Sequence, residues 1–375
     1  MFKIIKGGFP LPLGFKAGSL SCGLKRSGKP DLALIFSQVP AVAAGVFTTN
    51  QVKAAPILVS QKQIKSGITQ AIIANAGNAN CWTGAKGLCD AWSMVKLTAE
   101  SLGISPQHVL VTSTGVIGKP LPMAKVRRGI KNLISKLSNA GGKKVAWAIL
   151  TTDTRPKQIA IKVGKITIVG IAKGSGMIAP GMATMHAFIL TDALIEKPLL
   201  QKILKQAVDK SFNMISVDNC MSTNDCVFAL ANGMSKIKVG TGLVPVRDFQ
   251  KAFEEVCVYL AKEIARDGEG ATKLIEVRVN GAKNEKDARS AVKALIGSFL
   301  LKAASYGKDR NFGRILQAIG ATKVKVNWEK FRWNWKMKKK EDLITVYLAS
   351  GKSSAVGWGC DLTEGYVRIN ARYHT

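Results

Sequence analysis

Thr184 stands where a loop rich in glycine and proline gives way to an apolar segment. If the peptide bond between Ala183 and Thr184 were cut, the threonine would become a chain start, with its hydroxyl beside its own free amine. A hydroxyl next to a base is an activated nucleophile, and an α-amine with a pKa of about 8 is partly neutral near pH 7. Thr184 is therefore a candidate nucleophile, on condition that the bond before it is cleaved.

Two other segments could carry chemistry. Residues 111–118 place hydroxyls and glycines directly after a predicted strand, and such a turn can direct the Thr114 hydroxyl and a backbone N–H toward an oxyanion. An ordinary turn is the alternative interpretation. Glu269 lies between two glycines at the end of a predicted helix, where a solvent-exposed C-cap is the alternative. The glycines at 174 and 176 lack the strand and helix that a dinucleotide site needs, so we exclude that site.

Length and composition indicate a compact protein. A chain of 375 residues with 47% hydrophobic residues is expected to form two domains or subdomains, each with its own core. No apolar run approaches the roughly 20 residues of a membrane span, and the first residues do not form a secretion signal, so we expect a cytoplasmic protein. The seven cysteines are scattered and odd in number, which favours neither a disulfide framework nor a metal site.

The net charge of +31, from 55 Lys and Arg against 24 Asp and Glu, could attract polyanions. The basic residues are spread along the chain, which is not typical of a nucleic-acid reader. Residues 331–336 alternate aromatic and polar side chains, with Phe331, Trp333 and Trp335 on one face. This pattern predicts an amphipathic strand with a solvated outer face, and binding to an anionic surface is the alternative.

The elements expected along the chain are mixed. We predict strands at 32–36, 45–49, 71–74, 159–163, 166–171 and 184–191, and a long helix at 246–266. The last segment, which ends near Asn370, is interpreted as a terminal strand held in place. Helices and strands in this alternation predict a layered α/β architecture.

Several segments together resemble one family over nearly the whole length of the chain. The most informative segments are NAGNAN at 75–80, STGVIG at 113–118, TTDTRPK at 151–157, the block at 173–193, STND at 222–225 and DGEGATK at 267–273. Further matches lie at 31–35, 44–50, 52–56, 311–314, 361–364 and 368–370. In this order they resemble the ornithine acetyltransferases, or glutamate N-acetyltransferases, of arginine biosynthesis.

This resemblance implies self-cleavage between Ala183 and Thr184 into an N-terminal chain 1–183 and a C-terminal chain 184–375, which stay associated as a dimer of such pairs. Thr184 would carry an acetyl group from N-acetylornithine to glutamate by a ping-pong route, with Thr114 and Gly115 as the oxyanion hole. The substrate-binding positions implied by the resemblance are Thr152, Lys173, Thr184, Glu269, Asn370 and Thr375. Lys173 suits a carboxylate and Glu269 an ammonium.

The fold implied is an αββα sandwich like that of N-terminal-nucleophile hydrolases, with different connectivity. No cofactor or metal is implied, although acetyl-CoA is a possible second acetyl donor. The chain departs from the family pattern at Gly181, where a polar residue is usual, and at His186, which either packs in the core or tunes the site. The alternatives are a threonine aminopeptidase or amidase of similar fold, and a basic nucleic-acid-binding protein.

Overall fold

The computed structural model describes residues 2–5, 9–179, 185–240 and 242–371. Within these residues, nine strands form a sheet in the order β1-β6-β7-β8-β10-β3-β4-β5, with β2 paired to β3. Its strands are β1 (Phe2–Ile4), β2 (Phe15–Leu20), β3 (Leu32–Phe47), β4 (Ile68–Asn78), β5 (Val109–Val116), β6 (Lys157–Val163), β7 (Ile166–Lys173), β8 (His186–Thr191) and β10 (Cys226–Ala231).

The long strand β3 joins two halves of this sheet. Its first part pairs with β2 and β4, and its last part pairs with β10, with a register shift between Phe36 and Ala41. Alternate side chains of both halves meet in one buried cluster, in which Phe188 and Phe228 lie with Ile72 and Leu110. The sheet is therefore folded into two packed layers. A single strand of sixteen residues replaces the two strands predicted at 32–36 and 45–49, and the register shift between Phe36 and Ala41 lies within it.

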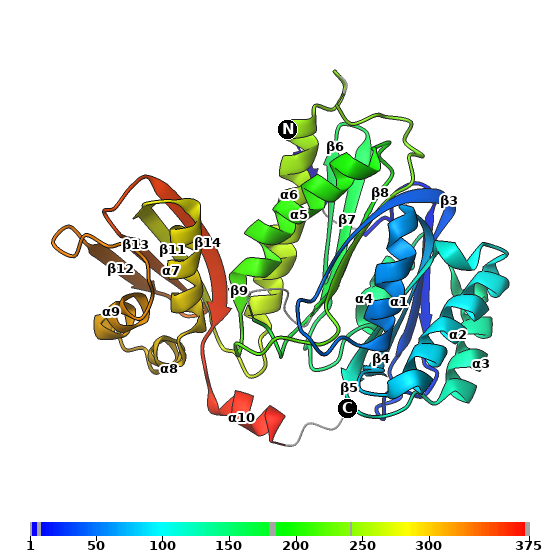
Figure 1. The fold of residues 1–375 in the computed structure, drawn as a ribbon, viewed down its shortest axis with the longest axis horizontal. Helices are drawn as coiled ribbons and strands as arrows, with labels where there is room; N and C mark the ends of the chain where they lie inside the picture. The colour runs from blue at the N-terminus through cyan, green and yellow to red at the C-terminus, as the bar shows by residue number, and fades with distance from the viewer. Residues whose placement is uncertain (1, 6–8, 180–184, 241, 372–375) are drawn as a thin grey trace.

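Helices cover the two outer faces of these layers (Figure 1). Helices α5 (Lys197–Lys210) and α6 (Val246–Arg266) pack on one half, against residues such as Ile168 and Ile189. Helices α2 (Gly84–Leu102) and α3 (Met123–Leu133) pack on the other half, as does α1 (Ala55–Gln63) beside β5. Helix α4 (Gly142–Ala148) contacts strands of both halves and adds its buried residues to the cluster between the layers. The layers run helix, sheet, sheet, helix, so the predicted αββα sandwich is confirmed.

A second sheet lies on the far side of α6, in the order β12-β13-β11-β14-β9 (Figure 1). Its elements are β9 (Ile215–Ser216), β11 (Leu274–Ala282), β12 (Arg332–Met337), β13 (Glu341–Tyr347) and β14 (Ser353–Cys360), with helices α7 (Glu285–Gly297), α8 (Phe299–Gly307) and α9 (Phe312–Gly320). Its buried residues belong to the same cluster that surrounds α5 and α6. The second sheet therefore has no separate cluster of its own, while two further clusters lie within the nine-stranded sheet and its helices.

The aromatic and basic segment forms β12, as the alternation predicted. Trp335 is buried and donates to Asp342 Oδ2 at 3.2 Å, and Trp333 stacks on Phe312 with ring centroids 5.4 Å apart. Arg332 and Lys336 are exposed on the other face. This geometry confirms a packed strand with a solvated outer face.

The predicted terminal strand is wrong. The segment is helix α10 (Glu364–Asn370), which begins where the Thr363 hydroxyl accepts a hydrogen bond from the Gly365 N–H. A threonine N-cap followed by an acidic residue favours a helix start, and here this local signal outweighs the alternating pattern that follows. None of the residues in α10 is buried.

No helix in the described ranges is long and apolar enough to cross a membrane. All seven cysteines are free thiols, four of them buried. Cys257 is buried on the apolar face of α6, between Phe253 and Leu260.

Candidate active site

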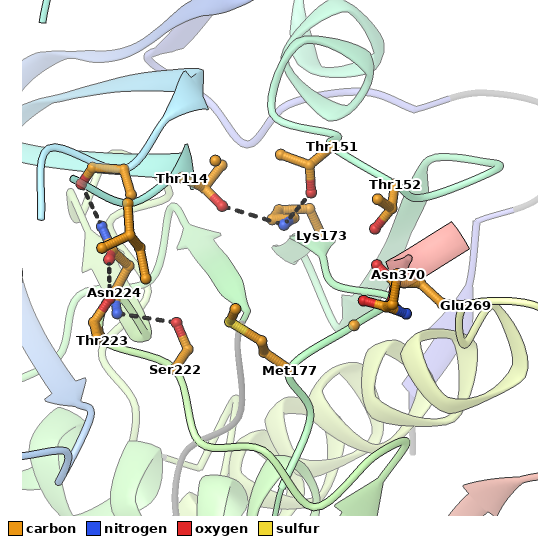
Figure 2. A pocket seen from close by; sticks show the side chains of 14 residues that line it. Thr114, Thr151, Thr152, Lys173, Met177, Ser222, Thr223, Asn224, Glu269 and Asn370 are labelled. Atoms are coloured by element: carbon orange, nitrogen blue, oxygen red, sulfur yellow. Dashed lines mark hydrogen bonds between the residues drawn. The ribbon is translucent and has the colours of Figure 1, made fainter. Parts of the chain in front are cut away.

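A polar pocket forms where segments from distant parts of the chain converge (Figure 2). Strands β5 and β7 end at this pocket, α10 reaches it from one side, and the segment before β10 reaches it from another. The lining residues are Ala79, Thr114, Gly115, Ile117, Thr151, Thr152, Lys173, Gly176, Met177, Ser222, Thr223, Asn224, Glu269 and Asn370.

The pocket brings together every predicted site residue that the structure describes. These are Thr114, Gly115, Thr152, Lys173, Glu269 and Asn370. The remaining predicted positions, Ala183, Thr184 and Thr375, and the departure at Gly181, lie outside the described residues. The roles assigned to all of these residues stay predictions.

Lys173 ends β7 with its ammonium in the pocket (Figure 2). Its Nζ donates to Thr151 Oγ1 at 2.8 Å and to Thr114 Oγ1 at 3.3 Å, and lies 4.0 Å from Asp153 Oδ2. Burial lowers the pKa of Lys173, and the Asp153 carboxylate only partly opposes this effect. Because hydroxyls rather than a close carboxylate hold this ammonium, it can still receive a carboxylate from a substrate.

Three buried charged residues, Asp153, Lys157 and Asp267, form a charge ladder next to Lys173. Lys157 Nζ lies 2.7 Å from Asp153 Oδ1 and 2.6 Å from Asp267 Oδ2. Burial alone would raise the pKa of Asp153, but Lys157 and Lys173 lower it well below its ordinary value. Asp153 also accepts the Gly174 N–H at 2.7 Å. The ladder thereby fixes the backbone directly after Lys173.

Thr114 and Gly115 lie near the end of β5, where it runs beside β4. Gly115 has a φ of +132°, and a Cβ there would meet the backbone carbon of Gly77 at 2.3 Å. Only glycine fits this close approach. Most of the turn predicted at 111–118 is therefore strand β5. The positive φ of Gly115 lies near the end of this strand.

Glu269 follows α6 and lies beside Asn370 of α10 in the pocket (Figure 2). Asn370 Nδ2 donates to Glu269 Oε2 at 2.8 Å, and Glu269 is only 6% exposed. The solvent-exposed C-cap is therefore wrong, because the glycine-rich segment folds back against the loop that follows β7. Gly176 makes room for this carboxylate, since a Cβ there would lie 2.4 Å from it. A buried carboxylate with few donors suits an ammonium group.

Among the lining residues that were not predicted as site residues, four carry a hydroxyl or amide side chain: Thr151, Ser222, Thr223 and Asn224. Asn224 Nδ2 bridges the carbonyls of Ala79 and Ser113, at 2.7 Å each. All four lie in segments that carry the family resemblance, at 151–157 and 222–225. Those segments were the available signal, but the sequence did not show which of their residues face a cavity.

His186 is buried and is not among the described residues that line the pocket. Its Nε2 lies 3.1 Å from the Asn224 carbonyl, to which it can only donate, and the ring contacts Thr112 Oγ1. Burial lowers the pKa of His186 to about 3, with a further contribution from Lys173. A neutral histidine at this place is a core residue that supports the backbone of Asn224.

Among the residues that the structure describes, no group of three or more His, Cys, Asp or Glu side chains could hold a metal ion.

The fold and the pocket define a layered α/β protein with a polar pocket that is lined by a buried lysine and a buried carboxylate. The chain belongs to the ArgJ family, whose sequence model matches residues 16–336 and 327–375. The resemblance to the family of the arginine pathway is thereby confirmed.

Curated relatives match over nearly their full length. The "Arginine biosynthesis bifunctional protein ArgJ" of Caldanaerobacter subterraneus subsp. tengcongensis is 48% identical over 403 residues, covering 100% of both chains. The protein of the same name from Symbiobacterium thermophilum is 45% identical over 399 residues, covering 99% of each. Among solved structures, a chain of the ornithine acetyltransferase from Mycobacterium tuberculosis, in complex with ornithine, is 38% identical with a TM-score of 0.47. It covers 49% of this chain and 100% of that chain.

Proposed function

We propose that this protein is a self-processed acyltransferase that moves the acetyl group of N-acetylornithine to glutamate in arginine biosynthesis, and so forms ornithine and N-acetylglutamate. The observation that carries the proposal is that Lys173 and Glu269 line the same pocket (Figure 2). N-acetylornithine carries an α-carboxylate and a free side-chain ammonium, which are the two groups that this pair can bind. The family membership and the name of the curated relatives support the pathway.

In the first half-reaction, Thr184 Oγ bonds to the acetyl carbonyl carbon while its proton passes to the Thr184 amine. The oxyanion that forms receives hydrogen bonds from the Thr114 hydroxyl and the Gly115 N–H, and loss of one such donor slows comparable reactions about 100- to 1000-fold. The amide C–N bond then breaks, the proton passes to the leaving nitrogen, and ornithine departs. The acetyl group remains as an ester on Thr184.

In the second half-reaction, the amine of glutamate attacks this ester, and the oxygen of Thr184 takes a proton back as N-acetylglutamate leaves. Acetyl-CoA is a second acetyl donor in this proposal, which the word bifunctional in the name of the relatives supports. The active form is a dimer of paired chains 1–183 and 184–375 in the cytoplasm, without a resident cofactor.

The test is the mass of the denatured protein before and after incubation with N-acetylornithine. Wild-type protein should give two fragments that meet between Ala183 and Thr184, and the C-terminal fragment should gain one acetyl group that glutamate removes. The variant Thr184→Ala should stay as one chain and gain no acetyl group. Thr167→Ala, a substitution at a threonine of β7 outside the pocket, should cleave and transfer like the wild type.

An uncut wild-type protein without acetyl transfer would refute the proposal. Gly181, which departs from the family pattern, would then be the first residue to substitute with a polar one. Release of free acetate instead of N-acetylglutamate would favour the amidase alternative, in which water replaces glutamate as the acceptor.

A further inference from the structure

Two buried aspartates lie on the segment 217–225, which connects β9 to β10. Asp218 accepts hydrogen bonds with both carboxylate oxygens: Oδ2 from the Met177 N–H at 2.7 Å, and Oδ1 from the Ile178 N–H at 2.9 Å. The Val217 N–H also donates to the Ile178 carbonyl at 2.9 Å. The Asp218 N–H donates to the same carbonyl at 3.4 Å, so four hydrogen bonds tie the backbone at 177–178 to this segment.

Asp225 holds a residue on the other side of the cleavage junction. Strands β8 and β10 are parallel, with His186 opposite Cys226, so Asp225 lies beside Met185. The Met185 N–H donates to Asp225 Oδ1 at 2.9 Å, and the Met185 carbonyl accepts from the Cys226 N–H at 3.2 Å. Both backbone groups of Met185 are therefore held by the neighbouring strand and the residue that precedes it.

Asp225 is fully buried, and its Oδ2 has no hydrogen-bond partner among the described residues. A buried carboxylate without full pairing is unstable as an anion, and burial raises the pKa of Asp225 well above its ordinary value. Its Oδ1 accepts the backbone hydrogen bond from Met185, and the amide oxygen of an asparagine can accept the same bond.

We propose that Asp218 and Asp225 are positioning residues that hold the two flanks of the Ala183–Thr184 junction and set the geometry in which the chain cleaves itself. This inference rests on the proposed function. Ile178 and Met185 bracket the junction in the sequence, and the segment 217–225 contacts both through its two aspartates. Because a misplacement of about 1 Å can slow a reaction about 100-fold, fixing both flanks favours cleavage directly.

The cleavage step needs such alignment. Thr184 Oγ bonds to the Ala183 carbonyl carbon, the C–N bond of that peptide breaks, and the nitrogen of Thr184 takes the proton of the hydroxyl. Water then hydrolyses the ester to the Ala183 carboxylate and a Thr184 with free amine and hydroxyl. Neither aspartate exchanges a proton or forms a bond in this sequence.

The experiment follows cleavage over time after a pulse of cell-free synthesis of the full chain, on denaturing gels. We expect Asp225→Leu and Asp218→Leu to cleave about 100-fold more slowly than the wild type. Asp225→Asn should cleave within about fivefold of the wild type, because its amide oxygen accepts the same bond. Asp218→Asn should be slowed by about tenfold or more, since one amide oxygen cannot replace two.

Asp192→Leu is the matched control, because Asp192 is equally buried, lies just after the far end of β8 and accepts the backbone N–H groups of Leu13 and Thr167. It should cleave at the wild-type rate, and melting temperatures of all purified variants show whether each one folds. Wild-type rates in both leucine variants at the junction would overturn the inference. So would an equal loss in Asp192→Leu, or an Asp225→Asn variant as slow as Asp225→Leu. A wild-type chain that does not cleave would instead refute the proposed function.

Discussion

Lys173 is the buried side chain to which we assign the substrate carboxylate. It is 2% exposed, and hydroxyls of Thr151 and Thr114 hold its ammonium. Burial disfavours the charged form of a lysine, and the pKa of Lys173 is correspondingly lowered. A substrate carboxylate would add a second counter-charge to that of Asp153 at 4.0 Å, so binding and protonation of Lys173 should support one another.

Replacement of Lys173 by methionine should reduce kcat/KM for N-acetylornithine about 10- to 100-fold, because hydrogen bonds to charged groups contribute about 1.5–3 kcal/mol. In the wild type, the KM should begin to rise at a pH below 10.5, the ordinary pKa of lysine. The reason is that Lys173 loses its proton at a lower pH than an ordinary lysine does. Steady-state kinetics across pH measure both effects. Lys165→Met, at an exposed turn between β6 and β7, should change neither, and an unchanged Lys173→Met enzyme would contradict the assignment.

At the scale of elements, the pocket depends on connections between segments rather than on any single helix or strand. The ladder of Asp153, Lys157 and Asp267 joins the loop before β6, the strand itself and the end of α6. Breaking a buried pair by removing one partner leaves an uncompensated charge, which is strongly destabilising. The ladder therefore contributes to stability as well as to the position of Lys173.

Asp153→Asn should lower the free energy of unfolding by about 3 kcal/mol at pH 7, since Lys157 loses a buried partner. The pKa of Asp153 is lowered in the folded protein, so its contribution is present above the unfolded pKa of about 4 and is lost as the pH falls toward the folded value. The difference between variant and wild type should therefore shrink below about pH 4. Urea unfolding at several pH values measures this difference, and a gap that widens in acid would contradict it.

At the scale of the whole molecule, the net charge of +31 is not concentrated on an aromatic binding face. The side chains that could stack on bases are partly used in packing, since Trp335 is buried and Trp333 stacks on Phe312. We therefore expect a polyanion to bind this protein by non-specific electrostatic attraction.

Binding to duplex DNA should therefore weaken steeply between 50 and 200 mM salt, by about 1000-fold or more if several phosphates are contacted, and should show no sequence preference. Fluorescence anisotropy with two unrelated duplexes measures this, and acetyl transfer in the presence of the same DNA is the control. Tight binding that does not depend on salt would revive the nucleic-acid alternative.

The sequence predicted much of the site because its signals are local. The segments around 114, 173 and 269 carry unusual runs of hydroxyls and glycines, and each reaches the pocket. Long amphipathic elements such as α6 were equally readable, since their apolar faces repeat with the helix period. The terminal helix α10 was misread because its seven residues are too few for periodicity to decide.

The sequence by itself determined the family, the layered α/β class, the amphipathic strand at 331–336 and the pairing of a lysine with a carboxylate as candidate ligands. Only the tertiary structure decided that Asn224 lines the pocket, that His186 lies beneath it, and that Asp218 and Asp225 hold Ile178 and Met185. These relations join residues that are tens to hundreds of positions apart. Such contacts depend on which strands become neighbours and in which register, and neither composition nor local periodicity contains that information.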